Sequence, residues 1–276
     1  MKSSQIKENN DIKVNVIIPF LSDLSSLKRC VKSIQGSKYV NHIYIINSGV
    51  ENVKQHYVNS NVIEVFADDN YWWTAAVNSG VQLSMLSNSK YSTLINSDNF
   101  FEDGSLNKLV EIAESHKLNI VGSMVKYDNG NAKHCGVKVN LNLGKQEFIN
   151  YNCSDYTSSF SRNINEVDSL GGQGVLINND TFRKVGLFNV LRLPHYSADL
   201  DFYLRAKECG YKVFCLKESV VIDDINSTGL IKAAGRYSIF DLIKIPFSIR
   251  SHLHYKNQWY LCQRHWDKKY ISFAYV

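Results

Sequence analysis

Near the middle of this 276-residue chain, an apolar run ends in a cluster of oxygen-bearing side chains. Residues Tyr91–Ile95 favour a buried strand, and Asn96, Ser97 and Asp98 follow it directly. Because Asn96 and Asp98 are two positions apart, they would lie on the same side of an extended chain. Such a pair can bind a hard divalent cation, Mg²⁺ or Mn²⁺, which in turn binds phosphate oxygens. The alternative is a strand-to-helix turn with side-chain capping.

A second carboxylate of interest, Asp199, comes just before a segment with helical character. The predicted helix runs through Phe202, Leu204 and Arg205. The positive end of the helix dipole keeps a carboxylate at this position ionised, which suits a general base. A plain N-cap is the alternative interpretation. Asp201 is expected to pair with Arg205 one turn further on.

Alternating strands and helices must position these groups. The pattern predicts an α/β fold with a doubly wound, mostly parallel sheet, whose strand ends meet at one edge. Residues 129–168 are expected to form strands and loops over the site. The predicted strands are Val14–Pro19, His42–Ile46, Val62–Phe66, Thr93–Ile95, Ile120–Val125, Ser169–Ile177, Tyr211–Leu216 and Ser219–Ile222; the predicted helices follow Ser22-Asp23 and Gly80 and span Leu106–His116, Asn179–Val185 and Asp199–Gly210.

The composition is that of an ordinary globular protein, with 44% hydrophobic and 21% charged residues. A net charge of +5 does not by itself indicate a nucleic-acid partner. The six cysteines include no C-x-x-C pair, which argues against a zinc knuckle or a disulfide framework and for reduced thiols. With neither a signal peptide nor an apolar run of about 20 residues in view, we expect a cytoplasmic protein.

Four stretches, in this order, resemble a family 2 glycosyltransferase with the GT-A fold. The resemblance covers residues 14–228. The first stretch is a strand whose end would pack on a nucleotide base, the second an asparagine-started loop, the third a D-x-D-like metal region and the fourth an acceptor-side segment. They read VNVIIPF (14–20), NYWWTAAVNSG (70–80), INSDNFFEDGSL (95–106), and GGQGVLI (171–177) followed by HYSADLDFYLRAKECGY (195–211).

The resemblance implies transfer of a sugar from a nucleotide-diphosphate sugar to a glycan hydroxyl, with inversion. It places a divalent cation at Asp98 and Asn96 and the general base at Asp199. The sequence has Asn96 where the family has a carboxylate. Asp223 or Asp224, which stand where a histidine is common, would restore the missing charge.

The resemblance also assigns residues to the two substrates. Of the neighbouring tryptophans, one is expected in the core and the other as a wall for the donor sugar. Asn47 and Ser48 stand where the family has an acidic residue that contacts the base. Core packing, helix capping and surface loops are the alternatives for these positions. The expected donor-site residues are Pro19, Phe20, Asn47, Ser48, Asn70, Trp72, Trp73, Asn78, Ser97 and Gly172, and the expected acceptor-site residues are His195 and Tyr196.

The C-terminal segment differs in composition from the rest. Residues 229–269 hold eight basic and two acidic residues, a charge of +6, interleaved with aromatic side chains. A peripheral site on the inner face of the plasma membrane fits this pattern, and with it a lipid-linked acceptor. Helices packed on the catalytic domain, or a contact between copies of the chain, are the alternatives. No nucleic-acid motif accompanies the charge.

We therefore divide the chain into a polar tail (1–12), a GT-A catalytic domain (13–228, with its nucleotide-sugar half at 13–125 and its acceptor half at 126–228) and a basic, aromatic, helical segment (229–276). The expected role is synthesis of a bacterial-type surface polysaccharide, such as lipopolysaccharide or capsule, or of a lipid-linked glycan. A non-catalytic protein of the same fold that binds nucleotide sugar or glycan is the main alternative. A nucleotidyltransferase is disfavoured because residues 20–26 (FLSDLSS) lack Gly, Arg and Lys.

Overall fold

The computed structural model describes residues 12–49, 51–58, 60–68, 71–149, 163–223, 245–249 and 251–267. Its strands are β1 Val14–Phe20, β2 Val40–Asn47, β3 Val62–Phe66, β4 Tyr91–Leu94, β5 Asn99–Phe101, β6 Ile120–Tyr127, β7 Ala132–His134, β8 Val137–Asn140, β9 Lys145–Phe148, β10 Ile164–Val167, β11 Val175–Asn178 and β12 Val213–Asp223. Its helices are α1 Leu24–Gln35, α2 Trp73–Leu86, α3 Ser105–His116, α4 Asn179–Val185, α5 Ala198–Glu208 and α7 Tyr255–His265, with short 3₁₀ turns η1 Lys54–His56 and η3 Ile245–Phe247.

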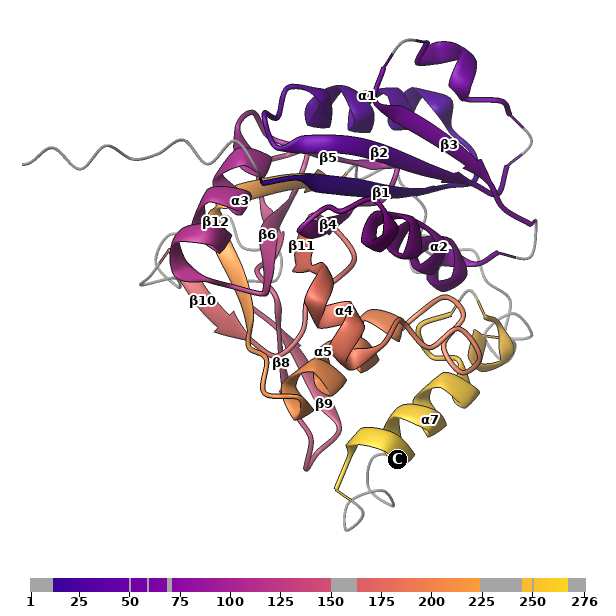
Figure 1. The fold of residues 1–276 in the computed structure, drawn as a ribbon. Helices are drawn as coiled ribbons and strands as arrows, with labels where there is room; N and C mark the ends of the chain where they lie inside the picture. The colour runs from indigo at the N-terminus through magenta and orange to yellow at the C-terminus, as the bar shows by residue number, and fades with distance from the viewer. Residues whose placement is uncertain are drawn as a thin grey trace, which may run out of the picture.

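One large sheet forms the centre of the molecule (Figure 1). Its strand order is β10-β12-β6-β11-β4-β1-β2-β3, with β5 paired to β12 and β7 paired to β6. Strands β1, β2, β3 and β4 pair in parallel, as do β6 and β12, whereas β11 runs antiparallel between β4 and β6. The sheet is thus mixed but mostly parallel in its main strands, and the C-terminal ends of β1, β4, β6 and β12 lie at one edge. Ligands of open α/β sheets bind at this edge.

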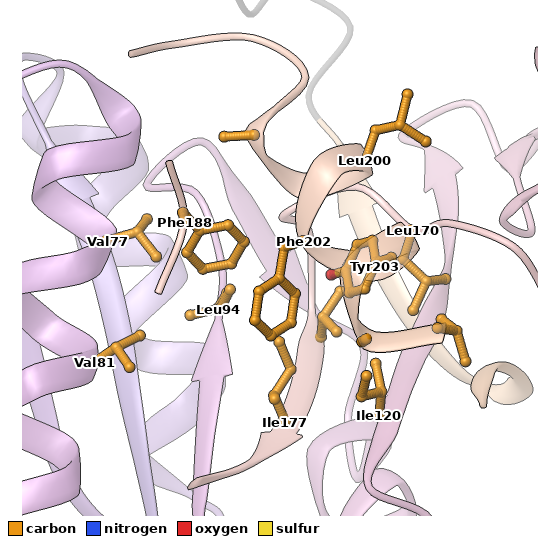
Figure 2. Close-up of a cluster of buried hydrophobic side chains, with 14 of the residues drawn as sticks. Val77, Val81, Leu94, Ile120, Leu170, Ile177, Phe188, Leu200, Phe202 and Tyr203 are labelled. Carbon is orange, nitrogen blue, oxygen red and sulfur yellow. The ribbon is translucent and has the colours of Figure 1, made fainter. Parts of the chain in front are cut away.

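Helices cover both faces of the sheet and produce two apolar cores. Figure 1 shows α1 and α2 on opposite sides of the first three strands. Successive side chains of β1 alternate between the faces: Val16 and Ile18 join the core under α1 and α3, and Ile17 joins the core under α2, α4 and α5. Figure 2 shows the second core, where Phe188 and Phe202 pack against the sheet.

The predicted α/β class and most of the predicted elements are confirmed, with three corrections. The helix that was expected to follow Gly80 begins at Trp73, so residues 73–80 of the expected loop form the first half of α2. The predicted strands at 211–216 and 219–222 are one strand, β12, whose pairing with β6 is irregular between Leu216 and Val220. The short strand β5 was not predicted; it pairs with β12 so that Asn99 lies opposite Asp223. Because β5 begins one residue after Asp98, this pairing brings the D-x-D-like region to the end of β12.

Among the described residues, no helix is both long and apolar enough to cross a bilayer. The five cysteines in the described part of the chain are all free thiols.

Candidate active site

The segment from Asn96 to Asn99 forms a turn and not an extended strand. The Asn99 N–H donates to the Asn96 carbonyl oxygen at 3.1 Å, which closes a four-residue turn at Ser97 and Asp98. The expectation that Asn96 and Asp98 lie on one side of an extended chain is therefore wrong. The turn forms because β4 ends at Leu94 and the chain reverses into β5.

Trp73 fixes the side chain of Asn96. Its indole N–H donates to the Asn96 side-chain oxygen at 2.9 Å, and the half-buried ring packs edge-on against Phe188. A Cβ atom built on Gly172 would lie 2.3 Å from a carbon of this ring. Only glycine leaves room for the indole here. The predicted donor-site residues Trp73 and Gly172 thus contact each other, and Trp73 also contacts the D-x-D-like turn.

A polar network joins this turn to the end of β12. The Asn99 side-chain N–H donates to Asp223 at 2.8 Å, and Gln173 donates to the Asn99 side-chain oxygen at 3.1 Å. The other carboxylate oxygen of Asp223 accepts from the Lys133 ammonium on β7. Asp223 is 5% exposed, so its charge is balanced inside the protein by Lys133.

A cation site at this edge would rest mainly on Asp98. In the part of the chain that the structure describes, no three His, Cys, Asp or Glu side chains form a metal-binding group. The Asn96 oxygen accepts from Trp73, and both Asp223 oxygens accept from neighbouring side chains. Magnesium in phosphate-binding sites needs only one or two carboxylates, since substrate oxygens and water complete its shell. Asp98 would suit that arrangement only together with a ligand that brings phosphate oxygens of its own.

Asp199 lies in the first turn of α5 and not at its N-cap, which is Ser197. Its surroundings favour the neutral form, contrary to the expectation that the helix start keeps it ionised. Burial raises the pKa of Asp199 to about 6, although the Leu200 N–H, 2.9 Å from the carboxylate, acts in the opposite direction. Burial and, after it, the negative charge of Asp199 raise the pKa of the nearby Tyr203 hydroxyl, which therefore stays protonated. A carboxyl group with a pKa near neutral is suited to exchange protons with a substrate at physiological pH.

Asp201, two residues after Asp199, fixes the position of helix α5. Arg205 donates to Asp201 at 2.8 Å, as predicted, and its other donors reach the carbonyl oxygens of Val185 and Leu187 at 2.9 Å. Burial alone would raise the pKa of Asp201, but the hydrogen bond with His265 and the charge of Arg205 hold it below its usual value. This fixes α5 relative to α4 and the loop after it.

The described C-terminal helix packs on α5. His265 on α7 lies 2.8 Å from Asp201, and Arg264 forms a paired salt bridge with Glu208 at 2.6 and 2.9 Å. Tyr260 accepts from Asn189 and extends the contact to the loop before α5. For residues 255–265, the alternative of a helix packed on the catalytic domain therefore describes the structure.

A row of aromatic rings precedes Asp199. His195 lies 5.4 Å from Trp72 and 4.4 Å from Tyr196, measured between ring centroids. The Tyr196 ring lies 3.8 Å from that of His252, tilted by 42°. The Tyr196 carbonyl also accepts from Asn257 on α7. We call Trp72, His195, Tyr196 and His252 the aromatic row. One member of the row, Tyr196, lies three positions before Asp199 in the sequence.

Other predicted donor-site residues have clear structural contacts. Both N–H groups of the buried Asn47 amide donate, to the Glu51 carbonyl and to Glu64, each at 2.6 Å. Asn78 donates to the Phe188 carbonyl at 2.9 Å and accepts from its N–H at 3.1 Å.

Phe20 is a core residue at the end of β1, and Pro19 is half-buried beside it. Ser48 also lies at this edge, 8% exposed, with its hydroxyl 3.5 Å from the Tyr71 carbonyl. Asn70 and Asp224 lie outside the described residues.

Four residues at this site, Asn99, Lys133, Gln173 and His252, were not singled out from the sequence. Asn99 had a signal, because it directly follows Asp98 in the quoted D-x-D-like stretch. Gln173 lies inside the glycine-rich turn, where only the glycines were predicted to matter for the site. Lys133 and His252 have no local motif, since each reaches the site only through the fold.

Comparison with known proteins was made for the sequence and for the fold. The family model described as Glycosyl transferase family 2 matches residues 15–169. A crystal structure of GalNAc-T7 with UDP, GalNAc and Mn²⁺ superposes with a TM-score of 0.63 at 12% identity, covering 95% of this chain and 53% of that one. The structure of S. aureus TarS 1–349 gives a TM-score of 0.54 at 10% identity, covering 77% of this chain and 60% of that one.

These two similarities show a shared GT-A fold, and the chain spans between half and two thirds of the length of either structure. Among curated proteins, none matches the sequence significantly.

Proposed function

Because the chain belongs to glycosyl transferase family 2, we propose that it transfers a sugar from a nucleotide-diphosphate sugar to a hydroxyl group of a glycan, with inversion at the anomeric carbon. The observation that carries the proposal is Asp199, a carboxylate in the first turn of α5 with a pKa raised by burial to about 6. The other carboxylate of that turn, Asp201, is bonded to Arg205 and His265, which leaves Asp199 as the candidate base. A lone base of this kind is what a one-step displacement requires.

In the proposed reaction, the Asp199 carboxylate accepts the proton of the acceptor hydroxyl. The hydroxyl oxygen forms a bond to the anomeric carbon, and the bond from that carbon to the diphosphate oxygen breaks, with its electron pair leaving on the phosphate. Asp98 would hold Mg²⁺ or Mn²⁺, and a cation held there would supply positive charge to the departing diphosphate. Asn96 is held by Trp73 and contributes to the shape of the donor pocket rather than to the charge.

The two tryptophans have separate roles in this proposal. Trp73 contacts Asn96 and Gly172 and belongs to the donor side. Trp72 contacts His195 and belongs with the aromatic row on the acceptor side. Ring faces in such a row pack well on the apolar CH faces of sugars. A glycan acceptor therefore suits the site better than a small alcohol.

The C-terminal helix suggests where the acceptor is found. Tyr255, Lys256 and Trp259 are exposed on one face of α7, opposite the residues that pack inward, and the sequence from 229 to 269 carries a charge of +6. Aromatic and basic side chains together bind anionic membrane surfaces. We propose that this face contacts such a membrane on its cytoplasmic side and that the acceptor is lipid-linked, as in synthesis of a surface polysaccharide.

The first experiment is a thermal-shift screen of UDP-, GDP-, dTDP- and CMP-sugars, with and without Mn²⁺. A bound donor at a hundredfold excess over its Kd should stabilise the protein by roughly 2–3 kcal/mol. The donor found in this way is then tested for transfer to glycan acceptors with wild type and Asp199→Asn. The variant should bind the donor and lose transfer. If no nucleotide sugar shifts the transition, the transferase proposal is wrong.

A non-catalytic protein that binds nucleotide sugar is the second candidate. It is favoured by the amides at Asn96 and Asn99 and by the neutralisation of Asp223 by Lys133, which leave little negative charge for a cation. The two candidates differ in turnover. Donor binding without release of free nucleotide, over a broad set of acceptors, would favour the second.

A further inference from the structure

Lys133 occupies an unusual position for a lysine at the carboxyl edge of the sheet. It lies in β7, with its ammonium paired to Asp223 and 6.0 Å from the centre of the Tyr127 ring. Its side chain is 27% exposed, whereas that of Asp223 is 7% exposed. The pair therefore has an inner carboxylate and an outer ammonium that still reaches solvent. An ammonium has three N–H donors, so the bond to Asp223 leaves donors for a ligand.

The position of Lys133 is fixed by groups that lead back to the D-x-D-like turn. Asp223 accepts from Asn99, which lies opposite it across the β5–β12 pairing, and Asn99 in turn accepts from Gln173. Asn99 follows Asp98 directly in the chain. The ammonium is thus linked through one side chain, that of Asp223, to the residue that follows the proposed cation ligand.

The positive charge of Lys133 also acts on two nearby histidines. Burial and then the charge of Lys133 lower the pKa of His134 to about 4, and the same two causes lower the pKa of His252. Both histidines are therefore largely neutral at pH 7. His252 packs against Tyr196, so the charge of Lys133 acts on a member of the aromatic row.

We propose that Lys133 binds the diphosphate of the nucleotide sugar and supplies positive charge to the leaving group, with Asp223 and Asn99 as its positioning residues. The inference rests on the proposed function and concerns how that site binds its donor. When the bond between the sugar and the diphosphate breaks, the electron pair stays on the phosphate oxygen, and the ammonium stabilises it there. No proton needs to leave Lys133 in this step.

The consequence is that diphosphate binding does not depend on a divalent cation alone. A site with one carboxylate, Asp98, holds a cation weakly, and the fixed ammonium compensates for the carboxylate that Asn96 replaces. Binding should be weakened by removal of the cation and still be measurable. A site that depends on metal alone would lose binding completely in a chelator.

The test uses inorganic pyrophosphate, which needs no knowledge of the nucleotide base. Its binding is measured by calorimetry in excess EDTA on wild type, Lys133→Met and Lys133→Arg. The control is Lys138→Met, because Lys138 is an exposed lysine on β8, the next strand along the chain. Wild type, the arginine variant and the control should bind. Lys133→Met should bind about tenfold more weakly or worse.

Lys133→Met alone leaves a buried carboxylate without its partner and could fail to fold. The double variant Lys133→Met/Asp223→Asn removes both charges and keeps the hydrogen bond to Asn99 within reach, so it tests the same inference in a folded protein. Equal pyrophosphate affinity in wild type and in a folded methionine variant would overturn the inference. It would leave the proposed function intact if sugar transfer persists, whereas absence of any nucleotide-sugar binding by wild type would overturn that function instead.

Discussion

Replacing Asp199 by asparagine should stabilise the protein while removing its activity. The carboxyl group has a pKa of about 6 in the folded chain and an ordinary value of 3.8, a difference of about 2 units. At 1.36 kcal/mol for each unit, keeping Asp199 ionised costs the folded state about 3 kcal/mol at neutral pH. Asparagine has nearly the same shape and carries no charge, so it escapes this cost. It still accepts from the Leu200 N–H.

The sign of the effect sets its pH dependence. Since the folded pKa lies above the unfolded one, the protonated group stabilises the fold below about pH 4. That contribution is lost as the pH rises through about 6. The advantage of Asp199→Asn over wild type should therefore be near zero at pH 4, grow between pH 4 and 6, and stay constant above that range. Sugar transfer should fall by about 10²–10⁴ because the amide cannot accept the proton.

Urea unfolding of the two proteins at several pH values between 4 and 8 measures this difference directly. Other carboxylates titrate in the same range, but they are common to both proteins and cancel. Asp180→Asn on α4 is the control, since its side chain is 77% exposed; it should change the free energy of unfolding by no more than about 0.5 kcal/mol. A difference between wild type and Asp199→Asn that does not change with pH would refute the reasoning.

Three further substitutions test the packing around the site. His265→Ala removes a buried partner of Asp201 and should cost about 3 kcal/mol, measured by urea unfolding, with α7 the first element to lose protection in hydrogen exchange. Asn78→Ala leaves two buried backbone groups of the loop after α4 without their partner and should cost about 2–4 kcal/mol by the same measurement. Gly172→Ala places a methyl group 2.3 Å from the Trp73 ring, so the indole must move; donor affinity should fall and tryptophan fluorescence should shift, and an unchanged spectrum would contradict the packing argument.

Local patterns in the sequence were sufficient to predict the first helix and the first three strands. Helix α1 begins at a cap supplied by Asp23, which accepts from the Ser26 N–H at 3.1 Å, and buries Leu27, Val31 and Ile34 at helical spacing. The strands β1 to β3 are short apolar runs whose ends are marked by polar or breaking residues. These features depend on neighbours within one turn or one strand, so the sequence determines them without the fold.

Local patterns failed where a residue depends on a distant partner. Strand β5 is three residues long and forms only because β12 presents its edge to it, more than 100 residues later. The turn at Asn96–Asp98 follows from that pairing. Because the local sequence does not reveal the pairing, it predicted an extended chain there. The same pairing also makes Asp223 a neighbour of Asn99.

The chemistry of the site divides in the same way. Asp98 and Asp199 are recognisable from the sequence because each stands at an element boundary that local patterns reveal. The raised pKa of Asp199, the pairing of Lys133 with Asp223 and the contact of Trp73 with Gly172 arise only in the folded chain. Desolvation, charge pairing and close packing depend on which segments lie together, and here those segments are 90 or more residues apart. The sequence determined which groups are available for the reaction, and the tertiary structure decided their charge and their partners.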